Sequence, residues 1–125
     1  MYLFFDTETT GLPKDWKAPM TDLDNWPRVI QLAYNLYDKD QNIIEQFSEL
    51  ITPNGWAVPK ESFWIQNGFS TEKNQKHGIA INTALDSFLK AYQNSSYPIA
   101  HNMSYDHNVL GAEMLRANIK ASKQP

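Results

Sequence analysis

The sequence predicts an α/β fold in which a mixed sheet carries flanking helices. Apolar and polar residues alternate over residues 28–37 and again over 43–51, with a polar turn between them, which is typical of a β-hairpin. Apolar residues then recur at helical spacing over 83–92. Because a meander of strands precedes alternating helices and strands, the order β-β-β-α-β-α indicates one mixed sheet with helices packed against it.

The first half of the chain supplies three strands. Residues 1–6 contain the apolar run 2–5 and predict a buried first strand, which is followed by a loop over 11–27 that contains proline and glycine. The second strand has one apolar and one polar face, as expected for a half-buried strand. Its apolar face holds Ile30, Leu32, Tyr34 and Leu36. Residues 38–42 form the hairpin turn, and residues 53–55 end the returning strand.

The second half supplies the helices and a last strand. A short helix is expected to end near Ile65, and a second helix to begin at Thr71. The next helix has one apolar stripe, which we interpret as core: Ala84, Leu85, Phe88, Leu89 and Tyr92. Residues 97–100 predict a short buried strand, and Ser104 is expected to cap a helix over 105–118.

The composition is that of one globular domain. The 125 residues are enough for a single hydrophobic core, and 42% of them are hydrophobic. Cysteine is absent and no apolar run is long enough to span a bilayer, so we expect a cytoplasmic protein without disulfides or a membrane partner. The net charge of −3 argues against a protein that coats long nucleic acid through many phosphate contacts. An enzyme that binds a few nucleotides through metal ions stays compatible with this charge, because the ions are positive themselves.

Two carboxylates stand at the end of the first predicted strand. Because side chains alternate between the faces of a strand, Asp6 and Glu8 lie on one face and Thr7 on the other. Two carboxylates on one face repel each other unless a cation lies between them, and such oxygen ligands favour Mg²⁺ or Mn²⁺. A pair of solvated charges is the simpler alternative. We favour a metal site because open α/β sheets place their sites where buried strands end.

A third carboxylate follows the last predicted strand. Asp106 falls in the first turn of the helix that comes after His101-Asn102. If strand 97–100 lies beside the first strand, its end opens on the same edge of the sheet as Asp6 and Glu8. An acid in the first turn of a helix is also favoured by the helix dipole alone. The combination with the first acidic pair favours the metal site.

A family resemblance is carried by Asp6-Thr7-Glu8-Thr9-Thr10-Gly11 and by His101-Asn102 with Asp106. The first stretch resembles the first motif of the DEDD-type 3′–5′ exonucleases, the group that includes the proofreading subunit of bacterial DNA polymerase III. The second resembles that family's second motif, and residues 26–33 resemble the strand between them. The resemblance covers essentially the whole chain and implies a ribonuclease H-like fold.

The resemblance implies a site for two ions, either Mg²⁺ or Mn²⁺. Asp6 would bridge both ions, Glu8 would hold the first and Asp106 the second. The residues expected to contact the terminal nucleotide are Thr7, Thr9, Thr10, Asn67 and Asn102. Turn, cap and strand-end hydrogen bonds are the alternative roles for the threonines and Asn102.

Asn67 belongs to this set because of how the chain is aligned with one segment of the family. His77-Gly78-Ile79 matches one segment of the family, but residues 67–73 match it better in their hydroxyl side chains and the Glu-Lys pair. In this register Asn67 stands where the family usually has histidine, and His77 is an ordinary loop residue.

The family's third motif, a histidine followed by an aspartate on a C-terminal helix, has no counterpart. No histidine or aspartate follows His107, and the only acid after Asp106 is Glu113. The resemblance makes the absent histidine a general base, worth about 10²–10⁴-fold in rate, and the absent aspartate a ligand of the first ion. His101 and His107 are candidate substitutes for the base.

Three explanations compete for this absence. The chain is the N-terminal and central part of a longer exonuclease, a natural short relative that no longer cuts, or a chain that a partner or second copy completes. We expect the first, so that residues 1–125 form an incomplete exonuclease-like domain that lacks the last strand and C-terminal helices and is weakly active or inactive.

The expected function is metal-dependent 3′–5′ exonuclease activity on single-stranded DNA or frayed 3′ ends, with release of nucleoside monophosphates. The alternative is a catalytically inactive nucleic-acid-binding or interaction module, which the missing third motif favours. A phosphohydrolase with Asp6 as nucleophile would need a local activating motif, which the threonine-rich turn does not resemble. An RNA 3′ end, a polymerase partner and self-association through an unpaired sheet edge are all compatible with the sequence.

Overall fold

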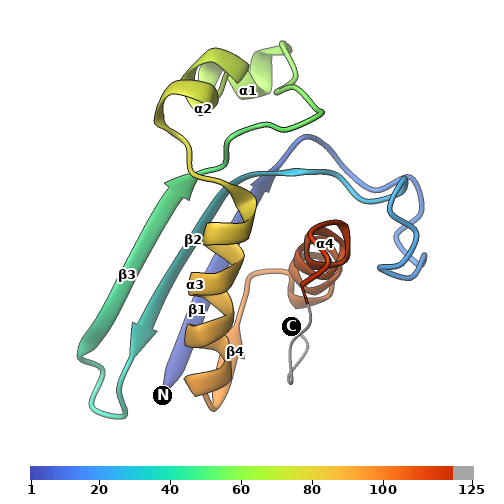
Figure 1. Cartoon of the computed structure of the whole chain (residues 1–125). Helices are drawn as coiled ribbons and strands as arrows, with labels where there is room; N and C mark the ends of the chain where they lie inside the picture. Colours follow the sequence, from blue (N-terminus) through green and yellow to red (C-terminus); the bar gives the residue numbers. More distant parts are fainter. Residues whose placement is uncertain (120–125) are drawn as a thin grey trace.

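The structure is a computed structural model that describes residues 1–119, and it holds a four-stranded sheet with helices on one face (Figure 1). The elements in chain order are β1 (Tyr2–Thr9), β2 (Val29–Tyr37), β3 (Ile43–Leu50), α1 (Ser62–Gln66), α2 (Thr71–His77), α3 (Ile81–Asn94), β4 (Tyr97–Ile99) and α4 (Met103–Arg116). The strand order is β3-β2-β1-β4, with β1, β2 and β3 antiparallel and β4 parallel to β1. The predicted mixed sheet with flanking helices is confirmed.

The two faces of β1 differ in what covers them. Its buried face holds Leu3, Phe5 and Thr7, and its exposed face holds Tyr2, Phe4 and Asp6. Helices α3 and α4 pack on the first face, and no helix within residues 1–119 packs on the second, which we call the open face. The prediction that β1 is a buried strand is therefore wrong for one face. A run of apolar residues in a strand does not indicate whether helices cover one face of the sheet or both.

The core lies between the sheet and helices α3 and α4. The apolar stripe predicted for this helix is confirmed, because its five members are all buried: Ala84, Leu85, Phe88, Leu89 and Tyr92. Phe88 packs edge-on against both Phe5 of β1 and Tyr34 of β2. Burial of each such side chain contributes about 1.5–3 kcal/mol. These ring contacts fix β1 and β2 against α3.

Two local predictions near β4 are wrong. Tyr97 and Ile99 are exposed, because β4 hydrogen-bonds only to β1 within the described sheet and turns these side chains to the open face. Helix α4 is capped by Asn102 and not by Ser104, since the Asn102 side chain accepts a hydrogen bond from the backbone N–H of Tyr105 at 3.5 Å. The cap thus falls two residues earlier than expected.

Helices α1 and α2 form a lobe beyond one end of the sheet (Figure 1). Ser70 caps α2, which begins at Thr71 as predicted. The buried side chain of Asn74 donates to the carbonyls of Ile30 and Ile51, which fixes α2 to β2 and to the end of β3. At Gly78 a Cβ would lie 2.4 Å from the Asn74 carbonyl oxygen, so this close approach requires glycine.

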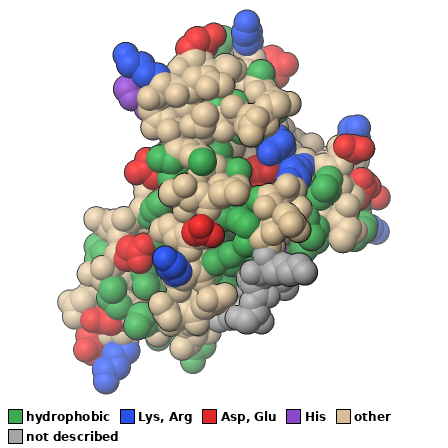
Figure 2. Space-filling model, viewed as in Figure 1, with side chains coloured by type: hydrophobic (Ala, Val, Ile, Leu, Met, Phe, Trp, Pro, Cys, Tyr) green, Lys and Arg blue, Asp and Glu red, His purple; other side chains and the backbone are tan. Residues whose placement is uncertain are grey.

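Charged side chains do not gather into one basic surface on the face that carries the helices. Figure 2 shows Lys and Arg side chains scattered among acidic ones across this face. None of the helices within residues 1–119 is long and apolar enough to cross a membrane.

Candidate functional site

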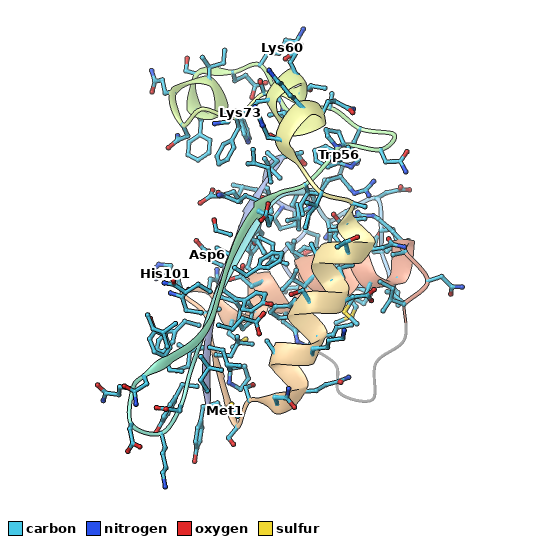
Figure 3. All side chains as sticks on the ribbon, turned by 60° about the vertical axis from the view of Figure 1, so that its left-hand side comes forward. Met1, Asp6, Trp56, Lys60, Lys73 and His101 are labelled. Atoms are coloured by element: carbon cyan, nitrogen blue, oxygen red, sulfur yellow. The ribbon has the colours of Figure 1, made fainter. Side chains whose placement is uncertain are left out.

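The acidic pair of β1 lies on the open face, near the end of the strand. Asp6 is exposed and pairs across the sheet with Ala33, and Glu8 is partly exposed and pairs with Gln31. Figure 3 shows Asp6 and His101 on the same side of the sheet, away from α3. The placement of both carboxylates on one face, with Thr7 opposite, agrees with the sequence analysis.

Asp106 reaches this region from the first turn of α4. Its side chain is 2% exposed, and it accepts a hydrogen bond of 2.7 Å from the Thr7 hydroxyl. Thr7 and Asp106 are 99 residues apart in the chain, so this bond fixes α4 to the middle of the acidic motif. The structure therefore brings the acids of both predicted motifs to one end of β1.

The charges of these carboxylates affect one another's pKa values. Burial raises the pKa of Asp106, the charge of Asp6 raises it further, and the hydrogen bond from Thr7 opposes the rise. Burial is also the first cause of the raised pKa of Glu8, followed by the charges of Asp6 and Asp106. A cluster of carboxylates with raised pKa values favours either a proton or a bound cation.

The donor set fits a hard divalent cation in its chemistry. Carboxylate oxygens are the ligands that Mg²⁺ and Mn²⁺ prefer, and a cation would relieve the repulsion among Asp6, Glu8 and Asp106. Within the described residues, however, no three acidic or histidine side chains are close enough to form a ready-made metal site. Binding of an ion would therefore require the three carboxylates to draw together.

A hollow of about 430 Å³ lies beside Glu8. It is lined by Thr7, Glu8, Thr9, Gly11, Leu12, Trp16, Phe63, Trp64, Asn102 and Tyr105. Much of this lining is aromatic, and the rings of Trp16 and Tyr105 lie 5.4 Å apart. A polar and acidic edge against aromatic walls suits a ligand with a charged part and a flat ring.

The turn after β1 is held by two distant segments. The Thr9 hydroxyl is hydrogen-bonded to the Tyr105 hydroxyl of α4, and Tyr105 also bonds the Gly11 carbonyl at 3.1 Å. The indole N–H of Trp64 donates to the Thr9 carbonyl at 2.9 Å. Burial raises the pKa of Tyr105, so its hydroxyl keeps its proton at neutral pH. These bonds fix the threonine-rich turn against both α1 and α4.

The other predicted nucleotide contacts occupy different places. Thr7, Thr9 and Asn102 line the hollow. Thr10 instead joins the turn to β2, because its hydroxyl accepts from the backbone N–H of Arg28 at 3.0 Å. Asn67 lies at the end of α1, is exposed, and donates to the Phe63 carbonyl at 2.6 Å.

Sequence reasoning missed the aromatic wall of the hollow. Trp16, Phe63, Trp64 and Tyr105 come from a loop and two helices, and no local spacing relates them. The one available signal was the number of tryptophans, four in 125 residues, several of them in segments without clear helical or strand patterning. The identity of their neighbours depends on the tertiary fold.

The chain was compared with known proteins by sequence and by structure. No family model matches the chain. The PolC-type DNA polymerase III of Streptococcus pyogenes serotype M18 is 33% identical over 124 residues, and that of serotype M2 is 32% identical over the same length. Each alignment covers 99% of this chain and 7% of the polymerase, so the chain spans a small part of these relatives.

The likeness to solved structures is one of fold. E. coli exonuclease I in complex with a dT13 oligonucleotide superposes with a TM-score of 0.72 at 18% identity. Its complex with a dA16 oligonucleotide superposes with a TM-score of 0.73, also at 18% identity. Both matches cover 95% of this chain and 24% of the exonuclease chain.

Proposed function

This chain has the ribonuclease H-like fold of the DEDD-type 3′–5′ exonucleases, and on that premise we propose that it is a metal-dependent 3′–5′ exonuclease. Its substrate is a single-stranded DNA or a frayed 3′ end, and its products are nucleoside monophosphates. One observation supports the proposal: Asp106 of α4 is hydrogen-bonded to Thr7, between Asp6 and Glu8 of β1, and Glu8 lines an aromatic hollow.

The residues of the site divide between metal and nucleotide. Mg²⁺ or Mn²⁺ bound by Asp6, Glu8 and Asp106 would supply the charge that prepares water and stabilises the leaving 3′ oxygen. Thr7 orients the Asp106 carboxylate through its hydroxyl. Tyr105 holds the turn at Thr9, so that backbone groups of this turn stay in place for the terminal nucleotide.

The aromatic hollow supports a single-stranded substrate. A base can stack on an aromatic ring only when it has left its duplex, and such stacking is worth about 1–3 kcal/mol per base. Trp16, Phe63 and Trp64 offer ring surfaces beside Glu8. In this proposal Thr7, Thr9, Thr10 and Asn102 contact the sugar and phosphate. Asn67, at the end of α1, is the outermost contact. E. coli exonuclease I, which shares this fold over 24% of its chain, forms complexes with dT13 and dA16 oligonucleotides, and this supports a single-stranded substrate.

An inactive nucleic-acid-binding module is the second candidate. One observation favours it: the described carboxylates do not form a ready-made metal site. If the general base is absent, cleavage is expected to be slower by about 10²–10⁴-fold. The two candidates share metal and nucleic-acid binding and differ in cleavage alone. The cytoplasmic location, an RNA substrate and a polymerase partner remain predictions.

Cleavage of a 5′-labelled single-stranded oligonucleotide in Mn²⁺ tests the proposal. The wild-type chain is expected to give a ladder that shortens from the 3′ end. Asp6→Asn should abolish the ladder, because it removes a carboxylate of the proposed metal site. Asp40→Asn is the matched control, since Asp40 is an exposed acid in the β2–β3 turn and the charge change is the same.

The outcomes separate the two candidates. A ladder that Asp6→Asn abolishes and Asp40→Asn leaves unchanged supports the exonuclease. Binding of Mn²⁺ and oligonucleotide without any ladder supports the inactive module. A ladder that persists in Asp6→Asn would show that the cleavage does not come from this site and would overturn the proposal.

A further inference from the structure

Another hollow, of about 300 Å³, lies between the start of α3, the end of α4 and the segment after β3. Figure 3 shows Trp56 on this segment, near the beginning of α3. The hollow shares no lining residue with the aromatic hollow beside Glu8, so the two are separate. Its lining is mainly polar and basic, with one indole: Arg28, Thr52, Asn54, Trp56, Asn82 and Arg116.

The charged residues around this hollow leave an excess of positive charge. Arg28 and Arg116 share the carboxylate of Glu113, so two positive charges face one negative charge. The Glu113 carboxylate is itself occupied, because it accepts from both arginines and from the backbone N–H of Val29. The lining of the hollow therefore attracts an anion.

Arg28 has hydrogen-bond donors that the protein does not use. Its Nε donates to Glu113 at 3.0 Å, whereas its two Nη groups donate to no acceptor within residues 1–119. The guanidinium carbon lies 5.6 Å from the centre of the Trp56 ring, and this contact holds the group in place. A guanidinium that is fixed along one edge and free along the other matches two oxygens of a carboxylate or a phosphate.

Further donors come from the start of α3 and from the segment after β3. Ile81 and Asn82, the first two residues of α3, both line the hollow. No side chain caps this helix and no acid lies in its first turn, so its first N–H groups lack a partner in the helix. Thr52 and Asn54 add a hydroxyl and an amide. A carboxylate has only two oxygens for these donors, whereas the oxygens of a phosphate point in several directions.

We propose that this hollow binds a phosphate group. The Nη groups of Arg28 and the first N–H groups of α3 bind its oxygens, and Glu113 and Trp56 hold Arg28 in position. The volume of about 300 Å³ is at the lower end for small-ligand pockets and leaves room for a sugar on the phosphate. The inference goes beyond the proposed exonuclease activity, because the three carboxylates of the candidate metal site take no part in it.

The position of Arg28 indicates which phosphate compound to expect. Two hydrogen bonds of 3.0 Å join its backbone to Thr10, in the turn that follows the acidic pair. The phosphate site thus adjoins the turn that is proposed to contact the terminal nucleotide. A free nucleotide and a nucleic-acid strand both carry the required group. The choice of a nucleotide as the phosphate carrier rests on the proposed function, whereas phosphate binding itself does not.

Nuclear magnetic resonance titration of the ¹⁵N-labelled chain in a metal chelator tests the proposal. The probes are inorganic phosphate, thymidine monophosphate and a thymidine tetranucleotide without terminal phosphates. Saturable shifts are expected at the Arg28 Nε–H and at the amides of Ile81 and Asn82. Tighter binding of thymidine monophosphate than of the tetranucleotide identifies a free nucleotide as the ligand, and the reverse order identifies a strand. Absence of saturable shifts at these groups with all three probes would overturn the proposal.

Asn82→Asp separates binding from folding. The helix dipole favours an acid in the first turn of α3, so urea unfolding is expected to show undiminished stability. The new carboxylate repels an anion in the hollow, and the dissociation constant of the tightest probe is expected to rise more than about tenfold. Gln41→Glu is the matched control, since it makes the same charge change at an exposed residue of the β2–β3 turn.

The variants give outcomes that differ from those of the cleavage assay. Equal affinity in the wild type and in Asn82→Asp would overturn the phosphate site, and so would an equal loss of affinity in Gln41→Glu. A chain that binds phosphate in this hollow but does not cut DNA would refute the proposed function and support this inference.

Discussion

Two buried carboxylates on the same helix differ in their hydrogen-bond and charge partners. Asp106 and Glu113 lie two turns apart on α4 and are 2% and 1% exposed. Glu113 accepts from Arg28 and from Arg116, each at 3.0 Å, and also from the backbone N–H of Val29. Asp106 accepts from the neutral hydroxyl of Thr7 and stands near two further acids.

The difference separates a structural acid from a functional one. A buried charge is tolerable when an opposite charge and hydrogen bonds compensate it, as they do for Glu113. For Asp106, hydrogen bonds from Thr7 and the charge of His101 lower the pKa, but burial and the charge of Asp6 outweigh them, so its charged form is disfavoured in the fold. A bound cation would compensate it. The comparison therefore indicates that the Glu113 end of α4 stabilises the fold, whereas the Asp106 end serves a site.

The largest expected effect is that of Glu113→Gln. The change leaves the guanidinium groups of Arg28 and Arg116 without their carboxylate and is expected to lower the free energy of unfolding by about 3 kcal/mol. This is the lower end of the range for a broken buried pair, because both arginines reach solvent in part. Urea unfolding measures it. An unchanged stability would mean that Glu113 has no structural role.

Addition of Mn²⁺ should stabilise the wild-type protein. A ligand at one hundred times its dissociation constant raises the free energy of unfolding by about 2.7 kcal/mol. The thermal unfolding midpoint should therefore rise with Mn²⁺ concentration in the wild type and in Asp86→Asn, whose exposed acid lies on α3. It should stay constant in Asp6→Asn. A rise of equal size in all three proteins would show that Mn²⁺ binds elsewhere.

Asp106→Asn should stabilise the metal-free protein by about 1 kcal/mol, as expected when a strained functional residue is relieved. Burial and neighbouring charge raise the pKa of Asp106 above its ordinary value of 3.8, so the folded state binds this proton more tightly than the unfolded chain does. Stability from protonation is present at low pH and is lost as pH rises through the folded pKa. The advantage of the variant should therefore vanish below pH 3.8 and grow above it.

Urea unfolding of wild type and Asp106→Asn over a series of pH values in a metal chelator measures this difference. A variant that is less stable than wild type at neutral pH would contradict the assignment of Asp106 as an uncompensated acid.

The smallest effect is expected for Trp64→Phe. The change keeps the aromatic wall but removes the hydrogen bond from the indole N–H to the Thr9 carbonyl, at a cost of about 1 kcal/mol or less. The turn after β1 should loosen, which hydrogen exchange of the Thr9 and Thr10 amides would report. Phe63→Leu is the control, because it trims a ring of the same hollow without touching this bond.

Local patterns predicted much of the fold. The alternation over residues 28–37 gave the half-buried β2, and the stripe from Ala84 to Tyr92 gave the buried side of α3, because both periods arise from the geometry of the element itself. The position of Asp6 and Glu8 on one face followed from the same two-residue period.

Features that depend on distant contacts could not be predicted. The open face of β1 and the exposure of Tyr97 depend on which side of the sheet the helices cover. The aromatic hollow depends on Trp64 reaching Thr9 across 55 residues of sequence. The structural role of Glu113 could not be predicted either, because its partner Arg28, just before β2, is 85 residues away in the sequence.

The most direct test of a metal site at Asp6, Glu8 and Asp106 is the Mn²⁺ affinity of the wild-type protein and of Asp106→Asn, measured by loss of the electron paramagnetic resonance signal of free Mn²⁺. We expect the wild type to bind Mn²⁺ and the variant, although folded, to bind it more than about tenfold more weakly, a difference of about 1.4 kcal/mol. Equal affinity in the two proteins would contradict it, because Asp106 would then be no part of a metal site.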